Sequence, residues 1–422
     1  MRGRSCSSGL VLLLPLVFLV SGCADYALKP SAYVYVATSP TWSWDNDPSQ
    51  PASVLVFRAG IDGKLTLVQT MPLAENKGRP LADEQLVAGS SNALYTEDQD
   101  SVFRYDIKAD GTLRGPAATI SPKDYEGGVG RQLTGALGVD RTGKYLTVEL
   151  YLPGQYYGGS GYPVVWQNYR VGGSSGYEFN GYEDGHPDTY YDDLYTPGVT
   201  AVSGNNQFAY GFLYDGFFPQ LQMMRRDSSG AMTVDPKFSE ADPARDTAGD
   251  RYFPDFLAAD SANHLAVVLD LGANPSNPHM VGDTWLASYT IDPATGAMAS
   301  TNTFGSMPQL SLRGPKTMAI SPDGAFVAVG AYWGLQILHF NGALPATPDG
   351  DVMITDWTVD QVAWDNEHHL YVLADDRISG RPLQITLFLY TVTEAGIEPV
   401  PGSPWNVPNG YRLQVVPRAA WH

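Results

Sequence analysis

From residue 31 onward, hydrophobic and polar positions alternate in short runs, and helical periodicity is almost absent. Each of the seven most regular runs begins with a small polar turn and continues as an apolar strand. Their central apolar residues recur at intervals of about 45–60 residues, a spacing typical of propellers and other repeat arrays. The seven runs cover residues 31–38, 91–98, 142–149, 205–212, 262–269, 323–330 and 367–374.

A second element follows five of these runs and consists of two short strands joined by a turn that contains glycine. Glycine at this place favours a β-hairpin, because it adopts the positive φ that tight turns require. One more apolar stretch precedes the first run of a repeat, as in residues 255–260 and 317–321, so each repeat should contain four strands. The glycines expected at positive φ are Gly63, Gly111, Gly230, Gly296 and Gly396.

Four antiparallel strands make one propeller blade, so the repeats predict an all-β fold, a seven-bladed β-propeller over residues 31–422. The first repeat lacks a preceding strand, whereas a spare apolar stretch remains at residues 412–417. We expect this C-terminal strand to complete blade one and to close the ring, which also removes exposed sheet edges. A set of β-sandwich domains is the alternative, and it explains neither the repeat nor the spare strand.

Three segments carry a resemblance to a known superfamily: FRAGIDGKL (57–65), YTIDPATGAM (289–298) and ISPDGAFVAVG (320–330). From residue 31 to its end, the chain resembles the lactonase-like seven-bladed propellers, the superfamily of 6-phosphogluconolactonase and the muconate-cycloisomerase-type propellers. The resemblance implies the propeller fold and raises lactone hydrolysis as a possible activity. These motifs build blades, so they specify the fold more than the chemistry.

The N-terminus has the plan of a secretory signal peptide over residues 1–22, with Arg2 and Arg4 before an apolar run at 9–20. This run is shorter than the ~20 residues of a spanning helix. It ends in Val20-Ser21-Gly22-Cys23, which resembles the bacterial lipobox. The resemblance implies cleavage before Cys23, a diacylglycerol on its thiol and acylation of the new amino group. An ordinary signal peptide that contains a cysteine is the alternative.

A lipid on Cys23 would anchor the chain to a membrane of the bacterial cell envelope, since several acyl chains together attach stably. Residues 23–30 would form the tether between the lipid and the first strand. In well-studied diderm bacteria an Asp after the cysteine favours retention at the inner membrane. Ala24 at that position therefore favours the outer membrane, with the propeller outside the cytoplasm.

Charge and cysteine content narrow the classes of function. The chain has 26 Lys and Arg against 45 Asp and Glu, a net charge of −19, and residues 1–22 contribute two arginines and no acid, which leaves −21 for the remainder. Such acidity argues against nucleic acid as a partner and against electrostatic adhesion to anionic lipid. The only cysteines are Cys6, inside the signal, and Cys23, so we expect neither a disulfide nor a thiolate metal site.

The repeat also identifies equivalent positions where the innermost strands start near the central channel. Enzymatic relatives place histidine around this point, and none of the six positions found here is histidine. A general base that titrates near neutral pH is therefore missing from the expected place. The six positions lie ten residues before their anchors and are Glu84, Ala136, Gly198, Asp255, Lys316 and Asp360.

A ring of carboxylates and one lysine could nevertheless bind or transform a ligand. A carboxylate whose pKa is raised by its neighbours can act as a base, and Lys316 or Arg313 could stabilise an oxyanion or hold a substrate carboxylate. Arg131 and Arg251 lie slightly earlier in their blades and join the candidate site. Structural ion pairs that line a wet channel are the alternative for all these charges.

Three long loops add aromatic and acidic residues: 40–51 with Trp42 and Trp44, 152–163 with its continuation at 172–197, and 271–283. Exposed aromatic rings beside Gly and Asn can stack on sugars or contact a protein. The acidic part of the second loop could offer oxygen ligands to Ca²⁺, but its spacing favours a solvated acidic loop, so no metal or other cofactor is expected. Its candidate ligands are Asp184, His186, Asp188, Asp192 and Asp193.

Two functions follow from these patterns. The first is a membrane-anchored envelope lipoprotein whose propeller binds a small molecule or a protein partner at the channel mouth without catalysis. The second is a lactonase-like hydrolase that acts on a sugar lactone or a related small molecule at the same place.

Overall fold

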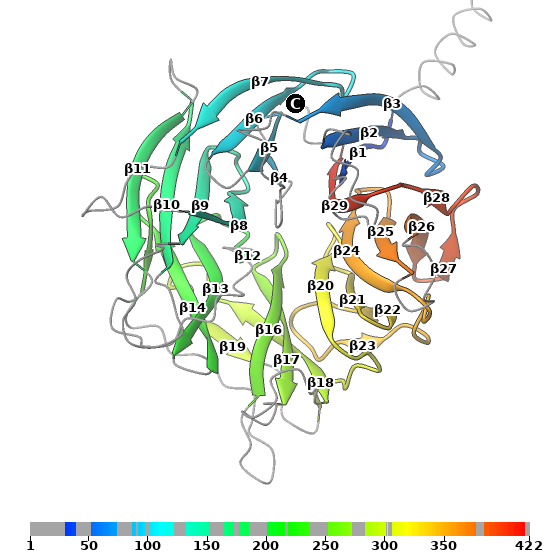
Figure 1. Cartoon of the computed structure of the whole chain (residues 1–422). Coiled ribbons are helices and arrows are strands. Elements are labelled where there is room, and N and C mark those ends of the chain that lie inside the picture. The colour runs from blue at the N-terminus through cyan, green and yellow to red at the C-terminus, as the bar shows by residue number, and fades with distance from the viewer. Residues whose placement is uncertain are drawn as a thin grey trace, which may run out of the picture.

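The described part of the chain forms seven antiparallel sheets arranged in a ring (Figure 1). The prediction of an all-β, seven-bladed β-propeller is therefore confirmed. In this part of the chain, no helix is long and apolar enough to cross a membrane. The computed structural model describes residues 30–38, 52–73, 87–89, 92–97, 101–121, 132–151, 164–172, 177–184, 201–215, 218–235, 252–271, 283–300, 302, 306–376 and 384–417.

Each sheet runs from an inner strand beside the centre of the ring to an outer strand at its rim (Figure 1). The inner strands are β29 (Gly410–Pro417), β4 (Val87–Gly89), β8 (Gln132–Val139), β12 (Ala201–Val202), β16 (Tyr252–Ala259), β20 (Pro315–Ile320) and β24 (Thr358–Trp364). The second strands are β1 (Ala32–Thr38), β5 (Ala93–Glu97), β9 (Tyr145–Tyr151), β13 (Phe208–Asp215), β17 (His264–Leu271), β21 (Phe326–Ala331) and β25 (His369–Asp375).

The outer half of each sheet holds the strands of the glycine hairpins. The third strands are β2 (Ser53–Ala59), β6 (Val102–Ile107), β10 (Val164–Val171), β14 (Phe218–Arg226), β18 (Thr284–Ile291), β22 (Gly334–His339) and β26 (Ile385–Thr393). The outer strands are β3 (Leu65–Pro72), β7 (Leu113–Ile120), β11 (Tyr177–Asp184), β15 (Met232–Val234), β19 (Met298–Ser300), β23 (Thr347–Pro348) and β27 (Gly396–Pro399). A short extra strand, β28 (Trp405–Asn406), pairs with β26.

The C-terminal strand closes the ring. β29 pairs antiparallel with β1, from Ala32 opposite Pro417 to Ala37 opposite Arg412. The last strand of the chain thus becomes the inner strand of the first blade, as the sequence predicts. This pairing joins the two ends of the ring through backbone hydrogen bonds and leaves no unpaired edge there.

The core is divided among the interfaces between neighbouring sheets. Tyr35 and Val56 of the first blade belong to one buried cluster with Leu94 and Tyr105 of the second. The second strands are covered from two sides, so β1 and β25 are buried at almost every position. Burial on both faces explains why these strands read as nearly continuous apolar runs.

The glycine hairpins dock onto the adjacent blade. Gly111 has a φ of 79°, and a Cβ built on it would lie 2.0 Å from the ring of Tyr33. The hydroxyl of the buried Tyr35 donates a hydrogen bond to the carbonyl oxygen of Gly111 at 2.9 Å, and Tyr210 does the same to Gly296 at 2.8 Å. The expectation of positive φ is confirmed at all five glycines: Gly63, Gly111, Gly230, Gly296 and Gly396.

The two faces of the ring carry different parts of the repeat. The hairpin face is where inner strands end, and it is defined by the turns 140–145, 260–264, 321–326 and 365–369 together with the glycine hairpins. The entry face is where inner strands begin, and it is defined by the starts of β16, β20 and β24 and by the turn 331–334. Because successive strands are antiparallel, connections between second and third strands also lie on the entry face.

Candidate functional site

Lys316 and Asp360 meet across two neighbouring inner strands. The Lys316 Nζ, on β20, forms an ion pair with the Asp360 Oδ1, on β24. Their side chains are 21% and 15% exposed, so each is largely covered and still reaches solvent. Both residues lie near the starts of their strands, which places the pair at the entry face.

A β-bulge explains why these two side chains leave the ladder. Pro315 pairs with Ala331 and Thr317 with Gly330, so Lys316 is an extra residue on β20. Asp360 is likewise an extra residue on β24, between paired positions 359 and 361. A bulge of this kind re-aims a side chain away from the regular pleat, and bulges are frequent beside functional sites.

Asp255 occupies the same kind of position in the blade before. Pro254 pairs with Leu269 and Phe256 with Val268, so Asp255 is the extra residue on β16. Its side chain is half-buried. Three consecutive inner strands thus carry a bulged charged residue, in the order acid, base, acid.

The other predicted site residues divide into two groups. Arg313 is exposed on the segment that leads into β20, three residues before Lys316. The rest lie outside the described residues: Cys23, Glu84, Arg131 and Arg251.

Tyr332 adds an aromatic ring to the ion pair. The Lys316 Nζ lies 5.0 Å from the centre of the Tyr332 ring, within the range of a cation–π interaction. The backbone of Tyr332 is held from two directions, because its amide donates to Gly314 O at 3.0 Å and its carbonyl accepts from Thr358 Oγ1 at 3.3 Å. The turn that carries Tyr332 is therefore fixed against both β20 and β24.

Tyr332 and Trp333 also present a large apolar surface to solvent. They are 49% and 51% exposed at the tip of the turn between β21 and β22. Exposed aromatic side chains can stack on a flat or ring-shaped group, while a lysine and a carboxylate nearby hydrogen-bond its polar edge. The sequence pattern missed this turn, although a Tyr-Trp-Gly step after an apolar strand was the available signal.

Three of the loop segments that stand out in the sequence connect a second strand to a third strand. Loop 40–51 lies between β1 and β2, loop 152–163 between β9 and β10, and loop 271–283 between β17 and β18. The strands on both sides of each loop therefore reach the entry face. These three segments fall almost wholly outside the described residues, as do His186, Asp188, Asp192 and Asp193 of the acidic segment. The expected continuation of the second loop over 172–197 is wrong in part, because residues 177–184 form the outer strand β11, in which Asp184 pairs with Val165.

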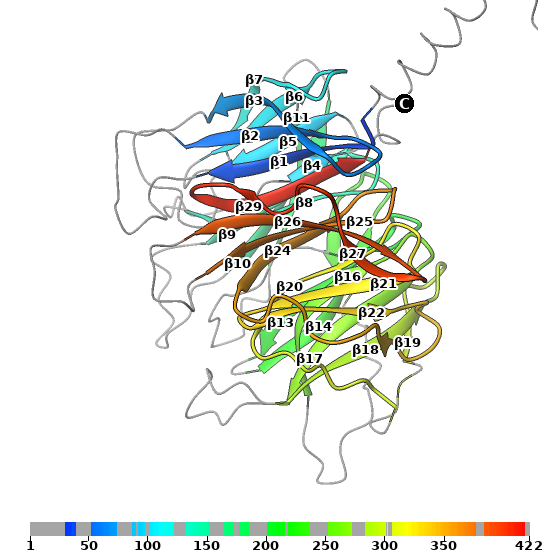
Figure 2. The same cartoon turned by 90° about the vertical axis from the view of Figure 1, so that its right-hand side faces the viewer.

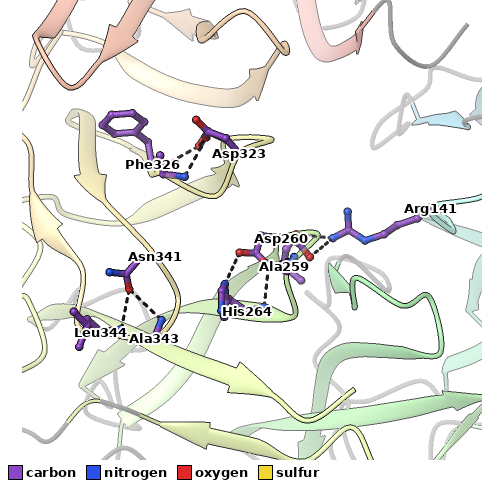
Figure 3. A network of polar contacts seen from close by, with 12 residues as sticks. Arg141, Ala259, Asp260, His264, Asp323, Phe326, Asn341, Ala343 and Leu344 are labelled. Carbon is purple, nitrogen blue, oxygen red and sulfur yellow. Dashed lines mark hydrogen bonds and ion pairs between the residues drawn. The ribbon is translucent and has the colours of Figure 1, made fainter. Parts of the chain in front are cut away.

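The hairpin face holds a separate set of polar contacts that tie the turns together. The Arg141 Nη2 donates to the carbonyls of Ala259 at 2.9 Å and Asp260 at 2.7 Å (Figure 3). Its Nε donates to Ser203 O at 3.1 Å. Burial lowers the pKa of Arg141, and the charge of Asp260 opposes this shift. One arginine thus cross-links the turns of three consecutive blades.

Two histidines that the sequence places in turns serve the same structural purpose. His264 Nδ1 lies 2.7 Å from Asp260 Oδ2, and His369 Nδ1 lies 2.9 Å from Asp365 Oδ2. Burial raises the pKa of Asp365, but the hydrogen bonds and charge of His369 outweigh burial and leave this pKa below its ordinary value. Both pairs close a strand-to-strand turn on the hairpin face. Among the described residues, no group of three or more His, Cys, Asp or Glu side chains could hold a metal ion.

Comparison with solved structures supports the fold and leaves the chemistry open. A candidate 6-phosphogluconolactonase from Bacteroides uniformis ATCC 8492 superposes with a TM-score of 0.57 at 13% identity, over 92% of this chain and 100% of that one. A protein from Lactobacillus plantarum has a TM-score of 0.54 at 12% identity, over 92% and 100%. A functionally unknown protein from Desulfotomaculum acetoxidans DSM 771 has a TM-score of 0.52 at 11% identity, over 91% and 98%. The sequence matches no protein-family model and no curated protein.

Proposed function

We propose that this chain is a lipid-anchored protein of the bacterial cell envelope whose propeller binds a small molecule or a protein partner at the entry face, without catalysis. The observation that carries the proposal is the Lys316–Asp360 ion pair beside the exposed rings of Tyr332 and Trp333. Charged, hydrogen-bonding and aromatic groups converge there from two adjacent blades. The loops 40–51, 152–163 and 271–283 join strands at the same face, and insertions gathered on one face of a repeat protein are typical of a binding surface.

Anchoring by lipid follows from the lipobox-like Val20-Ser21-Gly22-Cys23. The acidic chain has little electrostatic affinity for anionic headgroups, so the acyl chains on Cys23 would supply the attachment. The expected location is the outer membrane or another membrane that faces the periplasm. Replacement of Cys23 with Ser should release the protein from membrane fractions. Retention of the variant on membranes with an uncut signal would contradict the anchor.

The case for binding without catalysis rests on the residues at the bulged positions. None of them is histidine, and Lys316 and Asp360 each have the other as their charged partner. An ion pair of this kind is well suited to binding a ligand, because the lysine donates hydrogen bonds to it and the carboxylate accepts hydrogen bonds from it. Nucleophilic or general-base chemistry would require one member to give up its partner.

Lactone hydrolysis is the second candidate, and one observation favours it. The two carboxylates Asp255 and Asp360 occupy equivalent bulges on either side of Lys316 in successive blades. In such an arrangement one carboxylate could activate water while Lys316 or Arg313 stabilises the oxyanion. The shared fold of the Bacteroides uniformis protein is consistent with this alternative.

The proposal can be tested with the purified chain by titration with glucono-δ-lactone, gluconate, glucuronate and N-acetylglucosamine, and by photo-crosslinking to envelope proteins from position 333. Binding should be lost in Lys316→Met and in Trp333→Ala. It should persist in Lys144→Met, which removes an exposed lysine from the hairpin face. A ligand or partner bound equally well by all three variants would refute the entry-face site. Lactone turnover that is abolished by Asp255→Ala would establish the hydrolase instead.

A further inference from the structure

The chain enters the propeller at the hairpin face. β1 is a second strand, so it begins where inner strands end. Ser31 is fixed at this point, because its amide donates to Ala59 O at 2.9 Å and its hydroxyl donates to Gly60 O at 2.9 Å. In the side view, the arrow of β1 points away from the C-terminus while that of β29 points toward it (Figure 2). Both ends of the described chain therefore leave from the face opposite Lys316.

The length of the tether limits how the ring can meet a bilayer. Eight Cα-to-Cα steps separate Cys23 from Ser31, which span at most about 28 Å when fully extended. The six Cα-to-Cα rises of β1 span about 20 Å from the hairpin face to the entry face. For the entry face to touch the membrane, the tether would have to turn back at Ser31 and cover the whole height of the blade, about 20 Å of its reach of about 28 Å. The short tether thus favours an arrangement in which the hairpin face is nearest to the lipid.

Two exposed apolar side chains mark the tips of hairpins on that face. Ile61 is 47% exposed in the turn that follows β2, next to the Gly60 carbonyl that holds Ser31. Leu344 is 60% exposed in the turn between β22 and β23. Figure 3 shows this second turn beside the His264 turn, and a Cβ on Gly342 would meet the His264 side chain at 1.9 Å. Blade one therefore exposes an isoleucine and blade six a leucine, and both side chains could enter an apolar medium.

Carboxylates on the same face limit adsorption. Asp62, Asp110, Asp227 and Asp292 lie in its hairpin turns and are exposed. Anionic headgroups repel them, and the exposed Lys64, Lys108 and Lys144 of the same face offset part of this repulsion. The acyl chains supply the affinity, and the short tether together with the apolar tips sets the orientation.

We propose that the hairpin face is turned toward the lipid bilayer and that the entry face, with Lys316, Tyr332 and Trp333, is presented to the aqueous compartment. This inference rests on the proposed lipid at Cys23. It adds that the ligand or partner arrives from the aqueous side and not from the membrane to which the protein is anchored.

The cysteine content makes a direct test possible. The chain has only Cys6, which is removed with the signal, and Cys23, whose sulfur is blocked by the lipid, so one added cysteine can be labelled uniquely. Leu344→Cys and Trp333→Cys form a matched pair, because these exposed positions flank the two ends of the same strand, β22. Each variant is made as the full chain, labelled with one fluorophore and reconstituted into phosphatidylcholine vesicles that contain a headgroup spin-labelled lipid.

Quenching should be several-fold stronger at position 344 than at position 333, and Ile61→Cys should resemble Leu344→Cys. Equal quenching at both ends of β22, or stronger quenching at position 333, would overturn the orientation. Flotation of the same vesicles measures separately whether the protein is attached to the membrane. Protein that floats with the wrong end quenched leaves the anchor standing and refutes the orientation, whereas protein that fails to float refutes both. A chain that begins at Ala24, and so carries neither Cys6 nor the lipid, should show no quenching when it is labelled at position 344.

Discussion

The ion pair between Lys316 and Asp360 should contribute measurably to the stability of the ring, because it is largely covered. Exposed ion pairs typically contribute about 0.2–1 kcal/mol, whereas breaking a fully buried pair costs about 3–5 kcal/mol. With side chains 21% and 15% exposed, this pair lies between the two limits. A coupling free energy of about 1.5–3 kcal/mol is therefore expected.

The assay is a double-mutant cycle of Lys316→Met, Asp360→Asn and the double variant, followed by urea unfolding at neutral pH. Each single change should be destabilising, because it leaves one charge without its partner. The double variant should regain much of the loss, since it also removes the cost of burying both charges. Both positions are bulged out of the ladder, so the dependence of the free energy of unfolding on urea should stay unchanged.

A matched control is the Arg114–Asp106 pair, whose atoms are 2.9 Å apart but whose arginine is 71% exposed. The same cycle there should give a coupling below about 1 kcal/mol, and 1 M salt should reduce it more than it reduces the Lys316–Asp360 coupling. A coupling for Lys316 and Asp360 no larger than that of the control pair would refute the reasoning. The two side chains would then be solvated residues that line the channel, and not a preorganised ion pair.

Three further predictions concern the frame that holds the site. Gly111→Ala should lower the free energy of unfolding by at least about 1 kcal/mol more than Gly350→Ala in thermal or urea unfolding, since both glycines have a φ of 79° but only Gly111 faces a neighbour, Tyr33. Tyr35→Phe should cost about 1 kcal/mol in the same assay by removing the buried hydrogen bond to Gly111 O, and an unchanged stability would contradict that role. The folded state lowers the pKa of Asp365, so its stabilising contribution should be complete above the ordinary Asp pKa of about 3.9 and be lost as the pH falls through the lower folded value. Asp365→Asn should therefore flatten the acid limb of stability against pH, and an equally steep limb would argue against this assignment.

Much of the fold follows from the sequence because a propeller repeats one four-stranded unit seven times. Each blade needs the same apolar strands and hairpin turns, so the same pattern recurs along the chain. The signals are the spacing of the apolar runs, the hairpin glycines and the spare strand at 412–417. A single irregular loop obscures only one copy of such a pattern. The closure by β29 was predictable for the same reason, since it is the one strand missing from an otherwise complete set.

The site was less accessible from sequence, and the reason is geometric. Counting back from the anchors places Asp255, Lys316 and Asp360 at equivalent positions, but spacing alone does not show that all three are bulged out of the ladder. Nor does it show that the turn after β21 carries Tyr332 back to Lys316, because that contact depends on the hydrogen bonds to Gly314 and Thr358. Contacts between blades arise from the closed ring and have no local signature.

The bulged positions explain how one scaffold can keep its fold while its chemistry changes. Pro315 and Thr317 remain paired with β21 on either side of Lys316, so the ladder places little demand on the residue between them. A well-packed apolar pair at positions 316 and 360 could be as stable as the ion pair. The free energy needed to remove two charges from water offsets much of their mutual attraction. Stability alone therefore gives no reason for opposite charges at these two bulges. Their value lies in the donors and acceptors that they hold at the entry face, beside two exposed aromatic rings and on the face where the longest loops connect.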